Sequence, residues 1–267
     1  MNNNFSDYLL KHNLSQNTIT TYTRVIDSYF DLFSQINKNN LLNFKEHCAT
    51  HYKPSTANIY INALNKYLDF RKLGALKLKL LRVQQKSYLE NVISNEDYRY
   101  LKNQLKKEGK MKWYFVFWSL AATGSRISEL LQIKVENLLS GYVDMRTKGG
   151  KIRRIYIPDK LCMELLQWLN SQNIDSGFVF LNRSGSRITR SGIIKAMKTC
   201  AEKYNIDVKV MHPHSFRHKY AKNFLEKYND IALLADLMGH ESIETTRIYL
   251  RMTAGEQREI VNKVVTW

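Results

Sequence analysis

Residues 212–251 read HPHSFRHKYAKNFLEKYNDIALLADLMGHESIETTRIYLR, with a proline, a glycine and a serine at places where helices begin and end. The segment predicts three helices, over residues 213–227, 230–238 and 242–250. Pro213 suits the first turn of a helix, Gly239 ends one, and Ser242 can cap the next. We therefore expect the C-terminal part of the chain to be helical.

Three polar residues stand out on these helices. His214 and Arg217 lie three residues apart, so they share one helix face and can address one oxyanion together. His240 directly follows Gly239 and is presented from a turn, which favours a site residue over a core residue. A cap or a satisfied core group is the alternative for His214, and His218 competes for any role assigned to it.

Tyr249 follows His240 by nine residues and is one of 16 tyrosines in the chain. Its spacing alone indicates a core aromatic residue. A phenol, with an ordinary pKa of about 10, becomes a nucleophile only where neighbouring cations or a base assist it. The role of Tyr249 therefore depends on which side chains surround it.

Two cations further upstream stand at places that suit phosphate chemistry. Arg126 follows Gly124 in TGSRISEL, at an expected helix start where backbone N–H groups already favour an anion. Lys148 lies in TKGGK, whose Gly-Gly pair predicts a tight turn between β-prone stretches at 141–147 and 152–157. Each has an ordinary alternative, because arginines near helix starts and lysines at hairpin turns are common on protein surfaces.

The rest of the chain predicts two domains. Ser15 can cap one helix and Pro54 can begin another, so the N-terminal region is expected to be wholly helical. Ser94 marks the first helix of a second domain, the apolar residues 111–122 predict a buried helix, and residues 178–181 predict a short strand. A basic run at 66–86 fits either a solvated surface or a linker that crosses DNA phosphates, with Lys77, Lys79 and Arg82 as candidate DNA contacts.

Composition narrows the class of protein. The 41 Lys and Arg against 24 Asp and Glu give a net charge of +17, which attracts a polyanion such as nucleic acid. A hydrophobic content of 44% indicates a packed enzyme rather than a disordered basic tail. Cys48, Cys162 and Cys200 are scattered and suit neither a disulfide framework nor a zinc site, which favours a reduced, cytoplasmic protein. No secretory signal is readable at the N-terminus.

Taken together, these motifs resemble the signature of the tyrosine recombinase (phage integrase) family, which runs Arg, Lys, His-x-x-Arg, His or Trp, and Tyr. The matching segments are TGSRISEL, TKGGK, HPHSFRHKYA and LMGHESIETTRIYL, and LSQNTITTYTRVIDSYFDLF is similar to the opening helices of Xer recombinases and transposon-encoded relatives. Ser125 departs from the pattern, since many members have an apolar residue there. Lys151 is an alternative to Lys148 because this hairpin varies within the family.

The resemblance implies a mainly α fold with a small antiparallel β-sheet in the catalytic domain (α+β), built as a two-domain, C-shaped DNA clamp. It implies a helical core-binding domain at 1–80, a basic linker at 81–90, and a catalytic domain at 91–267 with a C-terminal helix after Tyr249. The expected partner is double-stranded DNA with an inverted-repeat site, bound by a homotetramer that is monomeric or weakly associated when free, away from any membrane. The apolar pattern of the last helix predicts that it docks on a neighbouring protomer.

The resemblance also implies a mechanism. Tyr249 would attack the scissile phosphate to give a 3′-phosphotyrosine and a free 5′-hydroxyl, with Lys148 as general acid. His214 would assist transfer of the phenol proton, and the developing charge would be stabilised by Arg126, Arg217 and His240. No metal or other cofactor is expected. The covalent link stores the energy of the phosphodiester, so two exchanges through a Holliday junction need no ATP.

Two other functions remain open at this point. A type IB topoisomerase or telomere resolvase shares the nucleophile and the cationic pocket but does not synapse two DNA duplexes. A DNA-binding accessory factor that has lost catalysis is the alternative from another class of protein. Among recombinases, integration or excision of a mobile element and resolution of replicon dimers fit equally well.

Overall fold

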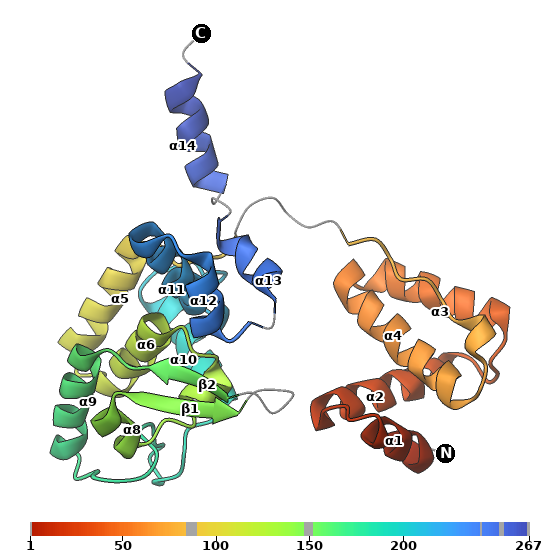
Figure 1. Cartoon of the computed structure of the whole chain (residues 1–267), viewed down its shortest axis with the longest axis horizontal. Helices are drawn as coiled ribbons and strands as arrows, with labels where there is room; N and C mark the ends of the chain where they lie inside the picture. The colour runs from red at the N-terminus through yellow and green to blue at the C-terminus, as the bar shows by residue number, and fades with distance from the viewer. Residues whose placement is uncertain (1, 84–89, 147–151, 241, 251–253, 266–267) are drawn as a thin grey trace. The chain divides into compact units, whose positions relative to one another are not determined.

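The computed structural model describes residues 2–83, 90–146, 152–240, 242–250 and 254–265, with the backbone alone at 2–3 and 254–257. The chain divides into two compact units, Met1–Gln85 and Lys86–Trp267, and Figure 1 labels most of their elements. The division falls within residues 81–90, which the sequence assigned to a linker. The two units are described separately below.

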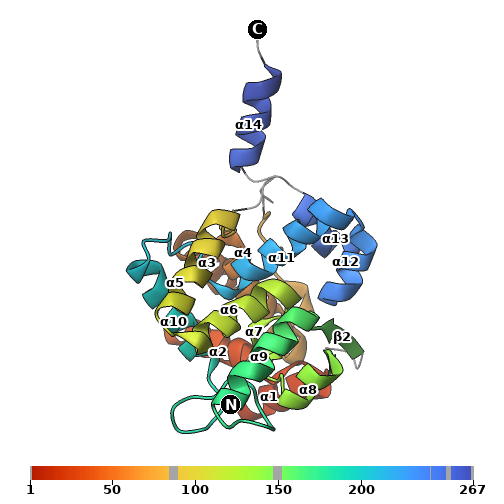
Figure 2. The same ribbon diagram turned by 90° about the vertical axis from the view of Figure 1, so that its left-hand side faces the viewer.

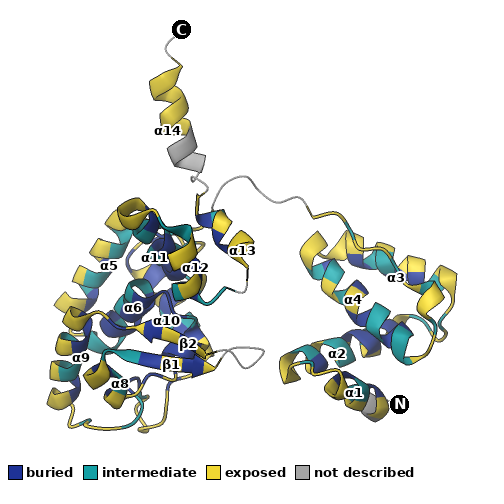
Figure 3. Ribbon diagram, in the orientation of Figure 1, coloured by how far each residue is buried: buried dark blue, intermediate teal, exposed yellow. Residues whose placement is uncertain are grey.

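Unit 1 is helical. Its elements are α1 (Asn2–Lys11), α2 (Gln16–Leu32), α3 (Lys38–His51), α4 (Pro54–Phe70) and the 3-10 helix η1 (Gly74–Leu76). The Ser15 side chain caps α2 by accepting a hydrogen bond from the Thr18 N–H, and Pro54 occupies the first turn of α4. Side chains from α1 to α4, among them Tyr29 and Phe44, form its buried core. Figure 3 shows stretches of these helices in the dark blue of buried residues. The expected helical character of the N-terminal region is confirmed as far as Leu76, where η1 ends.

An extended segment, residues 77–83, follows η1 and is tied to α4 by two asparagines. Asn65 bonds both the N–H and the C=O of Leu78, at 2.8 and 2.9 Å, and Asn58 bonds Leu81 in the same way at the same distances. The two asparagines are about two helical turns apart, so the segment runs along α4. The chain therefore stays on unit 1 as far as Leu81.

Unit 2 contains most of the helices and the hairpin. Its elements are α5 (Asn95–Lys107), α6 (Met111–Thr123), α7 (Ile127–Leu130), α8 (Val135–Ser140), β1 (Tyr142–Arg146), β2 (Ile152–Tyr156), α9 (Asp159–Ser171), α10 (Arg190–Lys203), α11 (Pro213–Tyr228), α12 (Ile231–Met238), α13 (Ile243–Arg247), η2 (Ile248–Leu250) and α14 (Ala254–Val264). Helix α6 packs against α5, α9 and α11, as Figure 2 shows, and buries Phe115, Phe117 and Leu120. The predicted buried helix at 111–122 is thus the centre of this unit.

Strands β1 and β2 pair antiparallel, with Met145 opposite Arg153 and Val143 opposite Ile155. The strand predicted at 178–181 is wrong, because Phe178 and Leu181 form only isolated bridges, with Lys134 and Arg187. Two single bridges to different partners do not make a ladder, so the sheet has two strands within the described residues. The predicted fold class, mainly α with a small antiparallel sheet, is confirmed.

Within the described part of the chain, none of the helices combines the length and the apolar character needed to cross a bilayer. The three cysteines are free and buried.

Candidate active site

Arg126 is positioned by the end of α6. Gly124 ends that helix in the left-handed conformation with φ 58°, and a Cβ at this position would lie 2.4 Å from the Tyr220 ring. Arg126 then precedes α7, whose Glu129 accepts hydrogen bonds from the Arg126 backbone N–H at 2.7 Å and from its Nη1 at 2.8 Å. Glu129 therefore fixes both the backbone and the guanidinium of Arg126.

Arg217 lies on α11 and is only 3% exposed. Its Nη1 donates to the Gly124 carbonyl at 2.6 Å, and its Nη2 donates to the Met238 carbonyl at 2.7 Å. Burial, followed by the charges of Arg126 and Arg153, lowers the pKa of Arg217 to about 10. The side chain remains a cation at neutral pH, held by the ends of α6 and α12.

His240 follows the turn at Gly239, which ends α12 in the left-handed conformation with φ 61°. Its Nε2 lies 3.0 Å from Arg217 Nη2, and its Nδ1 lies 2.7 Å from Thr246 Oγ1. Burial, then the charges of Arg217 and two further arginines, lowers the pKa of His240 to about 4, so the ring is neutral. Because a guanidinium can only donate, Nε2 accepts from Arg217 and Nδ1–H donates to Thr246.

Tyr249 is 6% exposed and lies on η2 rather than on the continuous helix predicted for 242–250. Its ring centroid is 6.3 Å from that of His240, in a stacked arrangement, and 5.4 Å from that of His218. Burial raises the pKa of Tyr249, while the charge and hydrogen bond of Arg217 and the charge of Arg126 act to lower it. The phenol is thus buried beside the cations that could stabilise its anion.

The two other histidines of α11 differ in their surroundings. His214 is exposed, and its pKa is lowered by burial of part of the ring and then by the charge of Arg217. His218 is half-buried, and burial lowers its pKa to about 4. The cap of α11 is neither of them but His212, whose Nδ1 accepts from the Ser215 N–H at 3.2 Å.

The sequence also predicted two further sets of candidate residues. Lys148 and its alternative Lys151 fall outside the described residues. The candidate DNA contacts Lys77, Lys79 and Arg82 belong to unit 1, where all three side chains are exposed on the segment tied to α4.

Glu129 contacts Arg126 and Thr246 contacts His240, while Arg153 contacts Glu129. None of these three residues was identified from the sequence. Glu129 had a usable signal, since a Glu three residues into a helix commonly bonds back to the residue before it. Arg153 had none, because it reaches Glu129 and Leu237, 24 and 84 residues away. Thr246 could be found only from the fold around His240.

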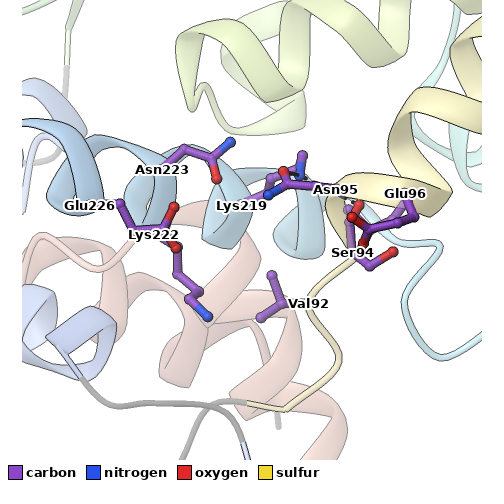
Figure 4. A pocket seen from close by; sticks show the side chains of 9 residues that line it. Val92, Ser94, Asn95, Glu96, Lys219, Lys222, Asn223 and Glu226 are labelled. Carbon is purple, nitrogen blue, oxygen red and sulfur yellow. Dashed lines mark hydrogen bonds between the residues drawn. The ribbon is translucent and has the colours of Figure 1, made fainter. Parts of the chain in front are cut away.

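A hollow lies between α11 and the start of α5, as Figure 4 shows. Lys219, two residues after Arg217, points to the opposite side of α11 and donates to the Ser94 carbonyl and to Asn95 Oδ1. Burial lowers the pKa of Lys219 to about 8. These bonds attach α11 to α5, and the hollow shares no residue with the candidate active site.

The described residues contain no group of three or more His, Cys, Asp or Glu side chains suited to a metal ion.

Comparisons with known proteins show which family and which solved structures this chain is similar to. The model of the phage integrase family matches residues 91–256, a range that contains Arg126 and Tyr249. The tyrosine recombinase XerA of Pyrococcus furiosus is 29% identical over 266 residues, 97% of this chain and 92% of that protein. Two solved structures share the fold with a TM-score of 0.71 each. The XerH recombinase bound to difH substrate is 21% identical and covers 91% of this chain and 78% of its own. The Tn1549 transposon integrase with circular intermediate DNA is 18% identical and covers 98% of each chain.

Proposed function

The chain belongs to the phage integrase family of tyrosine recombinases, enzymes that cleave and rejoin DNA, and we propose that it is a site-specific recombinase whose nucleophile is Tyr249. The observation that carries the proposal is the convergence of Arg217, His240 and Tyr249, which come from α11, the turn after α12, and η2. Arg217 bonds His240, and its charge acts to lower the pKa of Tyr249 against the larger effect of burial.

In the proposed reaction the Tyr249 oxygen attacks the scissile phosphorus as the bond from phosphorus to the 5′-oxygen breaks. The products are a 3′-phosphotyrosine and a 5′-hydroxyl, which takes a proton from Lys148. Arg126, Arg217 and His240 stabilise the charge on the phosphoryl oxygens. The two arginines are cations already fixed at the site and need little reorganisation to do so, and the neutral His240 acts through the bond that its Nε2 accepts from Arg217. His214 assists removal of the phenol proton.

The reverse reaction rejoins the strands. The 5′-hydroxyl of a partner duplex attacks the phosphotyrosine, restores a phosphodiester and frees Tyr249, so no nucleotide hydrolysis is needed. Two such exchanges pass through a Holliday junction. Integration or excision of a mobile element and resolution of replicon dimers are both consistent with this chemistry, since similar proteins include Xer recombinases and a transposon integrase.

The proposed partner is double-stranded DNA with an inverted-repeat site, bound by unit 1 as core-binding domain and by unit 2 as catalytic domain. The net charge of +17 favours binding to DNA. Exposure of Lys77, Lys79 and Arg82 on one ordered segment supports a phosphate contact there. A homotetramer on synapsed DNA, in the cytoplasm, completes the proposal. Ile260, Val261, Val264 and Val265 of the α14 region are exposed, which supports docking of this helix on a neighbouring protomer (Figure 3).

A covalent capture experiment tests the nucleophile. The protein is incubated with nicked duplexes that carry randomised inverted repeats, and DNA that remains attached after SDS treatment and phenol extraction is sequenced. We expect the wild-type chain to enrich a common site and Tyr249→Phe to attach none. The matched control is Tyr228→Phe, at an exposed tyrosine of α11, which should behave as the wild type. An adduct formed by the Tyr249→Phe protein would contradict the proposal. A wild-type chain that captures no more DNA than Tyr249→Phe would contradict it as well.

Strand exchange is tested separately on the selected site. Two duplexes of different length with different end labels are mixed with the wild-type chain. Joined products that carry both labels are expected of a recombinase. Relaxation of supercoiled DNA without joined products would indicate a topoisomerase instead.

A further inference from the structure

Arg153 is a charged side chain on the inward face of β2. It is 4% exposed, while Ile152 and Tyr156, on the opposite face of the same strand, are 69% and 59% exposed. A buried ion pair generally adds little stability compared with apolar residues of similar volume. Its burial therefore calls for an explanation other than stability.

The guanidinium of Arg153 joins two parts of the candidate active site. Its Nη1 donates to Glu129 Oε2 at 2.6 Å, on the same carboxylate that binds Arg126. Its Nε donates to the Leu237 carbonyl at 2.9 Å, in the last turn of α12. One side chain thus connects the residue that fixes Arg126 with the helix end that precedes His240.

The turn before His240 packs directly on Arg153. A Cβ at position 239 would lie 2.3 Å from Arg153 Cδ. Only glycine, which has no Cβ, allows the backbone to approach this side chain so closely. Arg217 bonds the adjacent carbonyl, that of Met238. The two arginines therefore hold consecutive carbonyls at the end of α12 and set the direction in which His240 leaves the helix.

One nitrogen of Arg153 remains unused. Its Nη2 is buried and has no hydrogen-bond partner among the described residues, a costly state for a charged donor. The charge of Arg153 also acts on Arg217 and on His240, lowering the pKa of each. A side chain that imposes these costs beside two other arginines is better explained by the chemistry of the site than by packing.

We propose that Arg153 is a positioning residue for DNA cleavage, which aligns Arg126 through Glu129 and His240 through the end of α12. This inference rests on the proposed function. It predicts that loss of Arg153 weakens the neutralisation of charge on the phosphoryl oxygens without removing any group that contacts them.

The test measures single-turnover formation of the covalent adduct on two versions of the captured site. One carries the normal scissile phosphate, and the other carries a methylphosphonate, which lacks one negative charge. We expect Arg153→Lys to slow cleavage of the phosphate about a hundredfold, because small misplacements of catalytic groups have effects of this size. On the methylphosphonate, which has less charge to neutralise, the same substitution should slow cleavage by a factor about tenfold or more smaller than on the phosphate. Arg126→Lys should show the same difference between the two substrates. An equal loss on both substrates would mean a merely structural role and would overturn the inference.

The matched control is Arg154→Lys on the same strand. Arg154 faces the other side, where it forms an exposed ion pair with Asp144 at 2.8 Å, and its substitution should change the ratio of the two rates by less than about twofold. A double-mutant cycle on the phosphate substrate adds a second measurement. If Arg153 acts through Glu129, the Glu129→Gln/Arg153→Lys protein should be little slower than the slower single variant. Fully additive losses would overturn the inference even if one variant were poorly folded.

Failure of the proposed function has a different signature. A wild-type chain that forms no Tyr249-dependent adduct would overturn the recombinase mechanism and this inference together. A normal wild-type adduct with an unchanged rate ratio in Arg153→Lys would overturn the inference alone.

Discussion

The Nη2 atom of Arg217 lies 3.0 Å from Nε2 of His240, and the same nitrogen donates to the Met238 carbonyl at 2.7 Å. The guanidinium therefore holds both the histidine and the backbone that presents it. These two bonds of Arg217 join α11 to the end of α12, and the charge of Arg217 also acts on Tyr249.

Arg217→Lys should damage both cleavage and stability. A lysine cannot reproduce the planar fork that reaches Gly124 and Met238 at once, so one buried carbonyl loses its partner. We expect adduct formation to fall by at least about a hundredfold and the free energy of unfolding in urea to fall by about 2–4 kcal/mol. Arg99→Lys, at an exposed site on α5, should stay within about 0.5 kcal/mol. A fully active Arg217→Lys protein would contradict the proposed charge stabilisation.

Gly124→Ala should destabilise unit 2 more than Gly109→Ala. Both glycines have positive φ, 58° and 67°, and both follow helices, so each alanine pays about 1–2 kcal/mol for the left-handed conformation. Only the Cβ at Gly124 meets another group, the Tyr220 ring at 2.4 Å, which adds about 1–3 kcal/mol. Thermal unfolding of the two variants measures the difference. Equal losses would show that Tyr220 moves aside freely.

His218 should make unfolding depend on pH. Burial, then the charges of His214, His212 and Arg217, lowers its pKa from 6.5 to about 4, so the unfolded chain binds more protons between these values. Stability should therefore be full above pH 6.5 and fall as the pH drops toward 4. Between pH 7 and pH 5 the loss should be about 2 kcal/mol smaller in His218→Gln than in the wild type. The free energy of unfolding is measured in urea at several pH values. The same pH dependence in His218→Gln and in the wild type would show that the imidazole is not neutral in the folded chain.

The segment 77–83 should contribute to the salt dependence of DNA binding. If Lys79 and Arg82 each contact a phosphate, Lys79→Gln/Arg82→Gln should reduce the slope of log affinity against log salt concentration by about 2. Lys77 should contribute less, because it pairs with Asp69 at 2.7 Å. Lys38→Gln, on α3, is the control in the same unit. Affinity for the selected duplex is measured at several salt concentrations in the Tyr249→Phe background, which does not cleave. A slope that Lys79→Gln/Arg82→Gln leaves unchanged would show that this segment faces solvent and does not contact DNA phosphates.

Removal of residues 259–267 should weaken assembly on DNA without unfolding unit 2. The residues removed include the exposed Ile260, Val261, Val264 and Val265. We expect the truncated chain to bind one half-site with normal affinity and to lose cooperative binding of the second half-site. Gel-shift titration on one and two half-sites separates these effects. Cooperative binding that survives the truncation would contradict docking of α14 on a neighbour.

Local chemistry explains which elements could be predicted from the sequence. Ser15, Pro54 and Gly239 act on hydrogen bonds within a few residues, so the ends of their helices follow from the sequence. The strand expected at 178–181 depends instead on ladder partners elsewhere in the chain, and only isolated bridges form there. Tyr249 lies on a tighter 3-10 turn than the helix expected for it, a difference that local propensity does not show.

The amino-acid sequence alone determined the helical architecture, the basic character of the chain and the order of its candidate residues, because helix caps, charge and motif spacing are written along the chain. It could not determine that Arg153 is buried while Ile152 is exposed. Alternation on a strand assigns them to opposite faces without saying which face is inward. That choice is made by Glu129 and the Leu237 carbonyl, which meet Arg153 only after the chain has folded. Tertiary structure likewise turned Tyr249 from one tyrosine among 16 into a buried phenol beside Arg217, because its pKa and its neighbours depend on contacts that no local pattern encodes.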